Sequence, residues 1–148
     1  MQMSDSAKLQ TRYVNTDLVL ESAAALEELA AAFEAAGLWK MAIVPGDDGI
    51  WHASFESEAH YTDPEAHFAA LLSAIESLPP ELRTVWDGCR RREFNLDFEC
   101  GDEPFAFIQN LSPELLPRLA AARASLSITL YALNHPNFGN PGHSMISD

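Results

Sequence analysis

Strict alternation of polar and apolar residues in two segments restricts the fold more than any other feature of the chain. Arg92–Cys100 places Phe94, Leu96 and Phe98 on one side and acids or asparagine on the other. Tyr13–Glu21 has the same period, with Val14, Thr16, Leu18 and Leu20 inward and Tyr13 on the polar side. A period of two predicts half-buried β-strands. Further strands are predicted at Leu38–Val44, Ile50–Glu56, Phe105–Gln109 and Leu126–Tyr131.

Helix signals separate these strands. Asp63 followed by Pro64 and Glu65 is typical of a capped helix start, and Pro79-Pro80 ends that helix. Ser112-Pro113-Glu114 repeats the pattern, and Ser22 precedes a run of strong helix formers that Gly37 closes. The predicted helices are Ala23–Ala36, Pro64–Leu78, Pro80–Cys89 and Pro113–Arg123.

The order of elements predicts an α+β two-layer sandwich. The part through Cys100 has the βαββαβ order of a ferredoxin-like core, and a βαβ extension follows it. Because the strands alternate, we expect a mostly antiparallel sheet of about six strands with helices on one face and water on the other. The 148 residues fit one domain at 12–133, with flexible tails at 1–11 and 134–148.

Charge and cysteine content exclude several classes of function. Nine Lys and Arg against 22 Asp and Glu give a formal net charge of -13, which repels nucleic acid and anionic lipid. The N-terminal residues contain no apolar signal segment, and no apolar run reaches the length of a membrane span. Cys89 and Cys100 are expected to be reduced thiols. A cytoplasmic protein is the expectation.

Acidic and other polar side chains gather on the open face of the predicted sheet. Such a face favours encounter with a basic protein partner, and the alternative is a solvated surface that only maintains solubility. Trp39 and Trp51 fall on the inward phase of their strands, whereas Trp86, beside Arg83 and Arg90, is a candidate contact residue. The candidate binding residues are Asp17, His52, Glu56, Asn95, Asp97, Glu99, Tyr131 and Trp86; the predicted face also includes Asn15, Lys40, Ser54, Ser127 and Thr129.

Catalytic motifs are weak in this sequence. No G-x-S-x-G turn or glycine-rich phosphate loop is present, and we expect no metal or other cofactor. His52, Asp97 and Glu99 form the trio to inspect if a metal binds. The alternative function is therefore a small-molecule or metal-dependent enzyme that uses His52 with nearby carboxylates. Arg90-Arg91-Arg92 is interpreted as pairing with acids such as Asp87 or Glu93.

The closing segments carry a resemblance. Leu111-Ser-Pro-Glu-Leu-Leu followed by Leu126-Ser-Ile-Thr-Leu-Tyr131 resembles the final helix and strand of small acidic bacterial α+β domains, some of which are similar to immunity proteins. The resemblance covers about 21 residues of the chain and implies a non-enzymatic function in binding another protein, such as a toxin. It assigns no functional residue. A homodimer joined through an exposed strand edge is compatible with this function and with the enzyme alternative.

Overall fold

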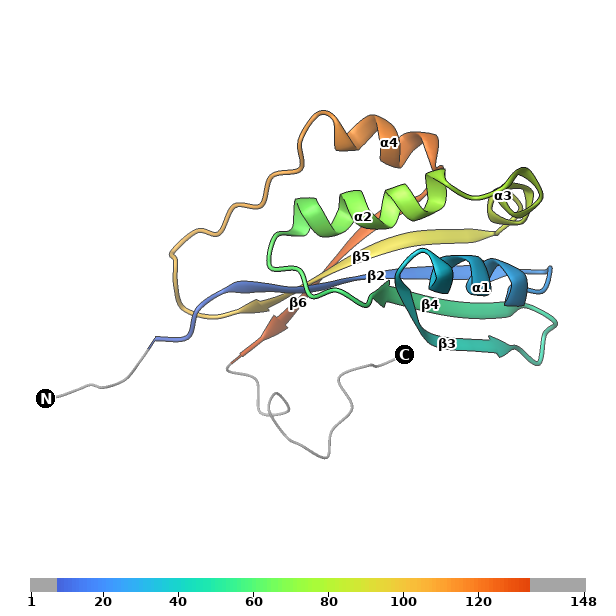
Figure 1. Ribbon diagram of the computed structural model, residues 1–148. Coiled ribbons are helices and arrows are strands. Elements are labelled where there is room, and N and C mark those ends of the chain that lie inside the picture. The colour runs from blue at the N-terminus through green and yellow to red at the C-terminus, as the bar shows by residue number, and fades with distance from the viewer. Residues whose placement is uncertain (1–7, 134–148) are drawn as a thin grey trace, which may run out of the picture.

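The computed structural model describes residues 8–133, which form a two-layer α+β domain (Figure 1). Residues 1–7 of the predicted N-terminal tail (1–11) and all of the predicted C-terminal tail (134–148) lie outside the described part. The five strands are β2 (Arg12–Ser22), β3 (Leu38–Pro45), β4 (Trp51–Ser57), β5 (Arg91–Cys100) and β6 (Ser125–Ala132). The helices are α1 (Glu27–Ala35), α2 (Pro64–Glu76), α3 (Pro80–Asp87) and α4 (Leu115–Ala121).

One open sheet has the strand order β3-β4-β2-β5-β6. Three neighbouring pairs are antiparallel, and β6 lies parallel to β5, so the sheet is mixed. The expected six-strand sheet is wrong, because Phe105–Gln109 forms no strand. A strand needs a hydrogen-bonded neighbour, and β6 already occupies the edge of β5. With β6 added, the sheet as a whole is not a clear ferredoxin-like arrangement.

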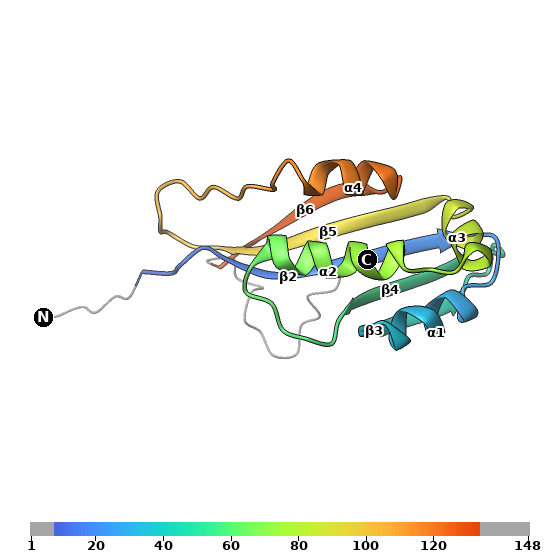
Figure 2. The ribbon, with the colours of Figure 1, turned by 45° about the horizontal axis from the view of Figure 1, so that its top comes forward.

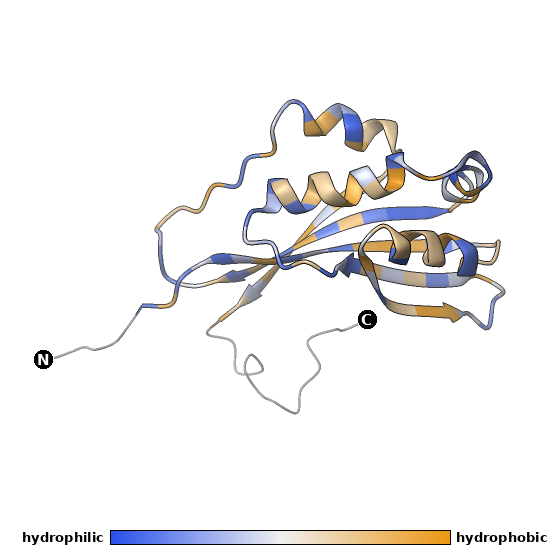
Figure 3. Cartoon of the chain, in the orientation of Figure 1, coloured by the Kyte–Doolittle hydropathy of each residue, from blue (hydrophilic) through white to orange (hydrophobic). Residues whose placement is uncertain are grey.

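The four helices cover one face of the sheet, as Figures 1 and 2 show from two directions. Figure 3 shows that α1 and α2 consist largely of apolar residues. The core between the layers contains Leu18 and Phe55 from the sheet, Phe33 from α1 and Phe68 from α2, all fully buried. None of the helices within residues 8–133 is long and apolar enough to cross a membrane.

Local signals explain where the helices begin and end. Asp63 caps α2, since its carboxylate accepts a hydrogen bond of 3.1 Å from the Glu65 N–H. The first helix starts at Glu27 instead of Ala23, because Ser22 belongs to β2 and its hydroxyl accepts a bond from the Ala24 N–H in the intervening turn. Helix α4 ends before Arg123, whose φ of 59° is left-handed.

Two β-bulges change which side chains face the helices. The register of β2 on β5 shifts between Tyr13 and Asn15, which turns Tyr13 into the core and away from the predicted polar side. The register of β3 on β4 shifts after Lys40. Lys40 therefore lies opposite Phe55 on the helix side, and Trp39, predicted to be buried, is 53% exposed. The predictions that Trp39 faces the core and that Lys40 lies on the open face were wrong, because an alternation pattern does not reveal a bulge.

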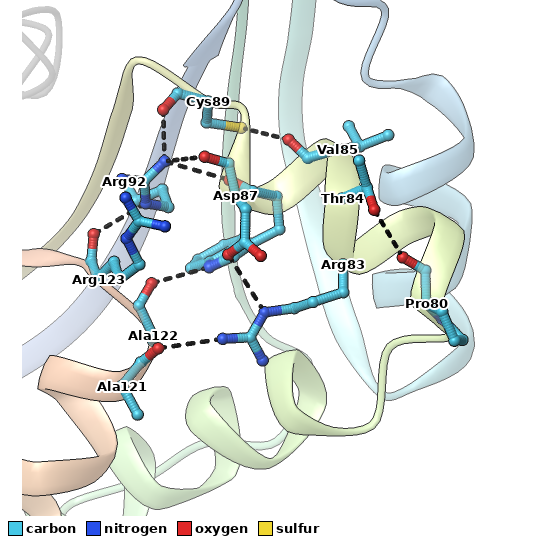
Figure 4. Close-up of polar contacts among 11 residues, drawn as sticks. Pro80, Arg83, Thr84, Val85, Asp87, Cys89, Arg92, Ala121, Ala122 and Arg123 are labelled. Carbon is cyan, nitrogen blue, oxygen red and sulfur yellow. Dashed lines mark hydrogen bonds and ion pairs between the residues drawn. The ribbon is translucent and has the colours of Figure 1, made fainter.

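Trp86 lies in the core and is removed from the candidate binding surface. Its side chain is fully buried, and its indole N–H donates a 2.9 Å hydrogen bond to the carbonyl of Ala122. Arg92 donates to the carbonyls of Arg123 and Asp87 at 2.8 and 3.2 Å, and also to that of Cys89 (Figure 4). These bonds fasten the end of α3 to the turn after α4, so Arg92 serves the fold.

Candidate functional site

The face of the sheet opposite the helices carries most of the polar residues predicted for it. Cross-strand partners lie on the same face of a sheet, so the register identifies the neighbours. Asn15 lies opposite Asp97, and Asp17 lies opposite Asn95. On β6, Thr129 lies beside Asp97. The centre of this open face therefore spans β2, β5 and β6, and Glu56 of β4 lies close enough to Asp17 to feel its charge.

At the margins of the open face, arginines neutralise the acids. Arg90 and Arg91 each place a guanidinium nitrogen 3.0 Å from a carboxylate oxygen of Glu21. Burial alone would raise the pKa of Glu21, but hydrogen bonds from the two arginines hold it below its usual range. Arg12 lies 2.8 Å from Glu99. The predicted pairing of the arginine run with acids is confirmed for Arg90 and Arg91.

The centre differs, because its three carboxyl groups form no ion pair within residues 8–133. We call Asp17, Glu56 and Asp97 the carboxyl cluster. Asp97 is only 8% exposed, and its Oδ1 atom is buried without a hydrogen-bond partner. The side-chain amide of Asn15 donates a 2.9 Å hydrogen bond to Oδ1 of Asp17. A buried acceptor that lacks a donor is costly, so the free protein leaves the charge of Asp97 poorly compensated.

Burial and mutual repulsion make the carboxyl cluster hold protons tightly. Burial, the charge of Asp97 and a hydrogen bond with Asp97 raise the pKa of Asp17 to about 7. Burial also raises the pKa of Asp97, opposed by hydrogen bonds from Asp17 and Thr129. Burial and the charge of Asp17 raise the pKa of Glu56. Both shifts favour protonated carboxyl groups in the free protein, and a cation bound beside them would favour the ionised forms.

Aromatic side chains border the carboxyl cluster. Trp39 is the cross-strand partner of Glu56 and is more than half exposed. Tyr131 lies beside Glu99 on the other side, and burial and the charges of Asp97 and Asp17 raise its pKa. A carboxylate next to an exposed indole ring suits a cationic side chain, which gains an ion pair and a cation–π contact.

The structure brings together five of the eight predicted site residues. Asp17, Glu56, Asn95, Asp97 and Tyr131 lie at or beside the centre of the open face. Sequence reasoning missed Trp39, because the bulge that exposes it leaves no signal in a simple alternation.

Two further predicted residues, Glu99 and His52, lie at the margins. Glu99 is paired with Arg12. His52 lies opposite Glu21, with its Nδ1 atom 3.7 Å from a Glu21 oxygen. Glu21 lies four residues from Asp17 along β2, roughly 13 Å, so His52 is about as far from Asp17 along the strand direction. The structure thus separates His52 from Asp97 and Glu99, and no group of three or more potential metal ligands occurs among residues 8–133.

An apolar groove of about 420 Å³ lies elsewhere on the domain. Phe105 and Phe107 line it from the segment before α4, and Ile128 and Leu130 line it from β6. It shares no residue with the carboxyl cluster.

Comparison of the chain with protein-family models, curated proteins and solved structures gives no match.

Proposed function

We propose that this chain is a protein-binding module whose open sheet face binds a basic protein. The observation that carries the proposal is the carboxyl cluster, three carboxyl groups on adjacent strands without a cation partner in residues 8–133, one of them with a buried unpartnered oxygen. An arginine or lysine of the partner supplies a cation for the carboxyl cluster and favours its ionised form.

The surroundings favour a protein partner over a small substrate. The open face is a sheet surface held by the hydrogen bonds of five strands, which gives fixed geometry over a wide area. Trp39 provides an exposed aromatic anchor beside Glu56, and tryptophan is enriched among residues that dominate interface energies. The resemblance to small immunity-like domains supports the same proposal, with toxin neutralisation or regulation of a basic protein as its specific form.

The enzyme alternative based on His52 has less geometric support. His52 contacts Glu21, which Arg90 and Arg91 already neutralise, and it lies far from the paired aspartates. We therefore retain only the binding function.

The test compares capture of basic proteins from a lysate of the source organism by two charge-matched variants. D17N/D97N removes the aspartate pair, and E34Q/E81Q removes two acids from helices on the opposite face. We expect wild type and E34Q/E81Q to retain one near-stoichiometric basic protein that elutes with salt, and D17N/D97N to lose it. Equal capture by all three proteins, or no captured protein, contradicts the proposal.

A further inference from the structure

The two edge strands of the sheet differ in how well they are protected against pairing with a strand of another molecule. Figure 2 shows β3 at one edge and β6 at the other. The β3 edge contains Lys40, the bulge after it and Pro45, all devices that discourage another strand from pairing. The β6 edge, SLSITLYA, contains no charge, no proline and no register shift. It is the only one of the five strands without a charged residue.

The helix side of β6 is apolar and open. Leu126, Ile128 and Leu130 are 39%, 60% and 65% exposed, although their partners on β5 belong to the core. The apolar groove joins the last two of these side chains to Phe105 and Phe107. An exposed apolar row along an unprotected edge is a template for strand addition.

The sequence of β6 is complementary to itself. In an antiparallel pair of two β6 strands centred on Ile128, Leu126 lies opposite Leu130 of the second copy, and Ser127 lies opposite Thr129. Apolar residues then meet apolar residues on one face, and hydroxyl residues meet hydroxyl residues on the other. A slip of one strand by a single residue, which would pair Ser127 with Ile128, would place the helices of the two copies on opposite faces and break this match.

Charge also distinguishes a second copy of this chain from a basic partner as the molecule that would pair with the β6 edge. Residues that face their own copy across a two-fold axis bring like charges together, which is destabilising in a chain with a net charge of -13. The uncharged β6 avoids this repulsion. A basic partner would instead be attracted to the carboxyl cluster, which the groove does not include.

We propose that two copies of this chain associate through antiparallel pairing of their β6 strands about Ile128, so that the two sheets become one sheet of ten strands. The groove-lining residues of each copy extend the contact on the helix side. This inference does not depend on the function proposed for the open face.

The first experiment measures mass by sedimentation velocity from about 5 to 200 µM, with circular dichroism as a check of folding. We expect wild type to reach twice the chain mass of 16.3 kDa and I128K to stay monomeric. V44K provides the matched control, because Val44 is 52% exposed on the opposite edge strand, and it should dimerise like wild type. D17N/D97N should also dimerise.

A second measurement tests the register without placing a charge on β6. In a C100S background, I128C should form a disulfide-linked dimer rapidly on mild oxidation, since the residue faces itself, and L126C should not. A wild-type protein that stays monomeric overturns the proposal. Hydrogen–deuterium exchange then shows whether another part of the chain covers β6, because covered β6 amides exchange slowly. A dimer that survives I128K, or one that V44K abolishes, overturns it as well.

Discussion

Strand β2 carries a polar cluster on each of its faces, and the two clusters are built in opposite ways. On the helix side, the Tyr13 hydroxyl lies 2.5 Å from Oγ1 of Thr16 and 2.7 Å from Nδ1 of His67. We call these three residues the inner cluster. On the open side, Asp17 joins Glu56 and Asp97 in the carboxyl cluster. The inner cluster is uncharged, whereas the carboxyl cluster carries charge that nothing in residues 8–133 neutralises.

Burial shifts both clusters toward their neutral forms, but with opposite consequences. Burial lowers the pKa of His67 to about 4, and its ring also stacks on Tyr61 at 4.8 Å. Burial raises the pKa of Tyr13 to about 12. These groups therefore stay neutral over the physiological range. Asp17, with its pKa of about 7, changes charge within that range. The inner cluster is accordingly structural, and the carboxyl cluster is able to respond to a ligand.

The largest expected effect comes from removing the hydroxyl that links the inner cluster. Tyr13→Phe leaves Thr16 and His67 without this partner in the core, and each unsatisfied buried group costs about 1–3 kcal/mol. We expect a loss of about 3 kcal/mol in the free energy of unfolding at pH 7, measured by urea denaturation. Thr129→Val, which removes one hydroxyl on the open face, should cost about 1 kcal/mol. A Tyr13→Phe protein as stable as wild type would contradict the structural role.

The second prediction concerns how His67 changes the stability of the protein at low pH. The folded-state pKa of His67 lies below its unfolded value, so the unfolded chain binds the extra proton, and stability is lost as pH falls from about 6.5 to about 4. We expect the stability difference between wild type and His67→Gln to shrink by about 2 kcal/mol from pH 7 to pH 4.5. Thermal denaturation across this range measures it. A difference independent of pH would show that His67 titrates normally.

The third prediction concerns Asp17, which lowers the stability of the protein at high pH instead of at low pH. The folded-state pKa of Asp17 lies above its unfolded value, so its protonated form favours folding, and stability is lost as pH rises from about 4 through about 7. Asp17→Asn removes this loss and should gain about 1.5 kcal/mol at pH 8.5 and little at pH 4. The measurement is urea denaturation at both values. Destabilisation at pH 8.5 would mean that Asp17 has a cation partner in the free protein.

The smallest effect is expected at the margin of the open face. Glu99→Gln breaks an ion pair with an Arg12 side chain that is 62% exposed, and exposed pairs contribute about 0.2–1 kcal/mol. We expect a loss of about 0.5 kcal/mol in the free energy of unfolding that falls in high salt, measured by urea denaturation with and without added salt. A loss of several kcal/mol, or one that high salt leaves unchanged, would contradict an exposed ion pair at this margin.

Local patterns in the sequence predicted much of this arrangement. The alternation in β5 assigned Phe94, Leu96 and Phe98 to the core, as the structure confirms. The cap at Asp63 located the start of α2. The prediction of a strand at Phe105–Gln109 was wrong, because its alternation is short and the free edge of β5 pairs with β6 instead.

The amino-acid sequence by itself determined the α+β class, the start of α2 at its Asp63 cap, and the side of β5 that faces the helices. These features arise from neighbours in the chain, whose spacing fixes their geometry. Only the tertiary structure decided that Asp17, Glu56 and Asp97 meet across three strands, that arginines neutralise the margins, and that β6 is an unprotected edge. These features depend on strand order and on bulges, which arise from pairing between segments far apart in the sequence.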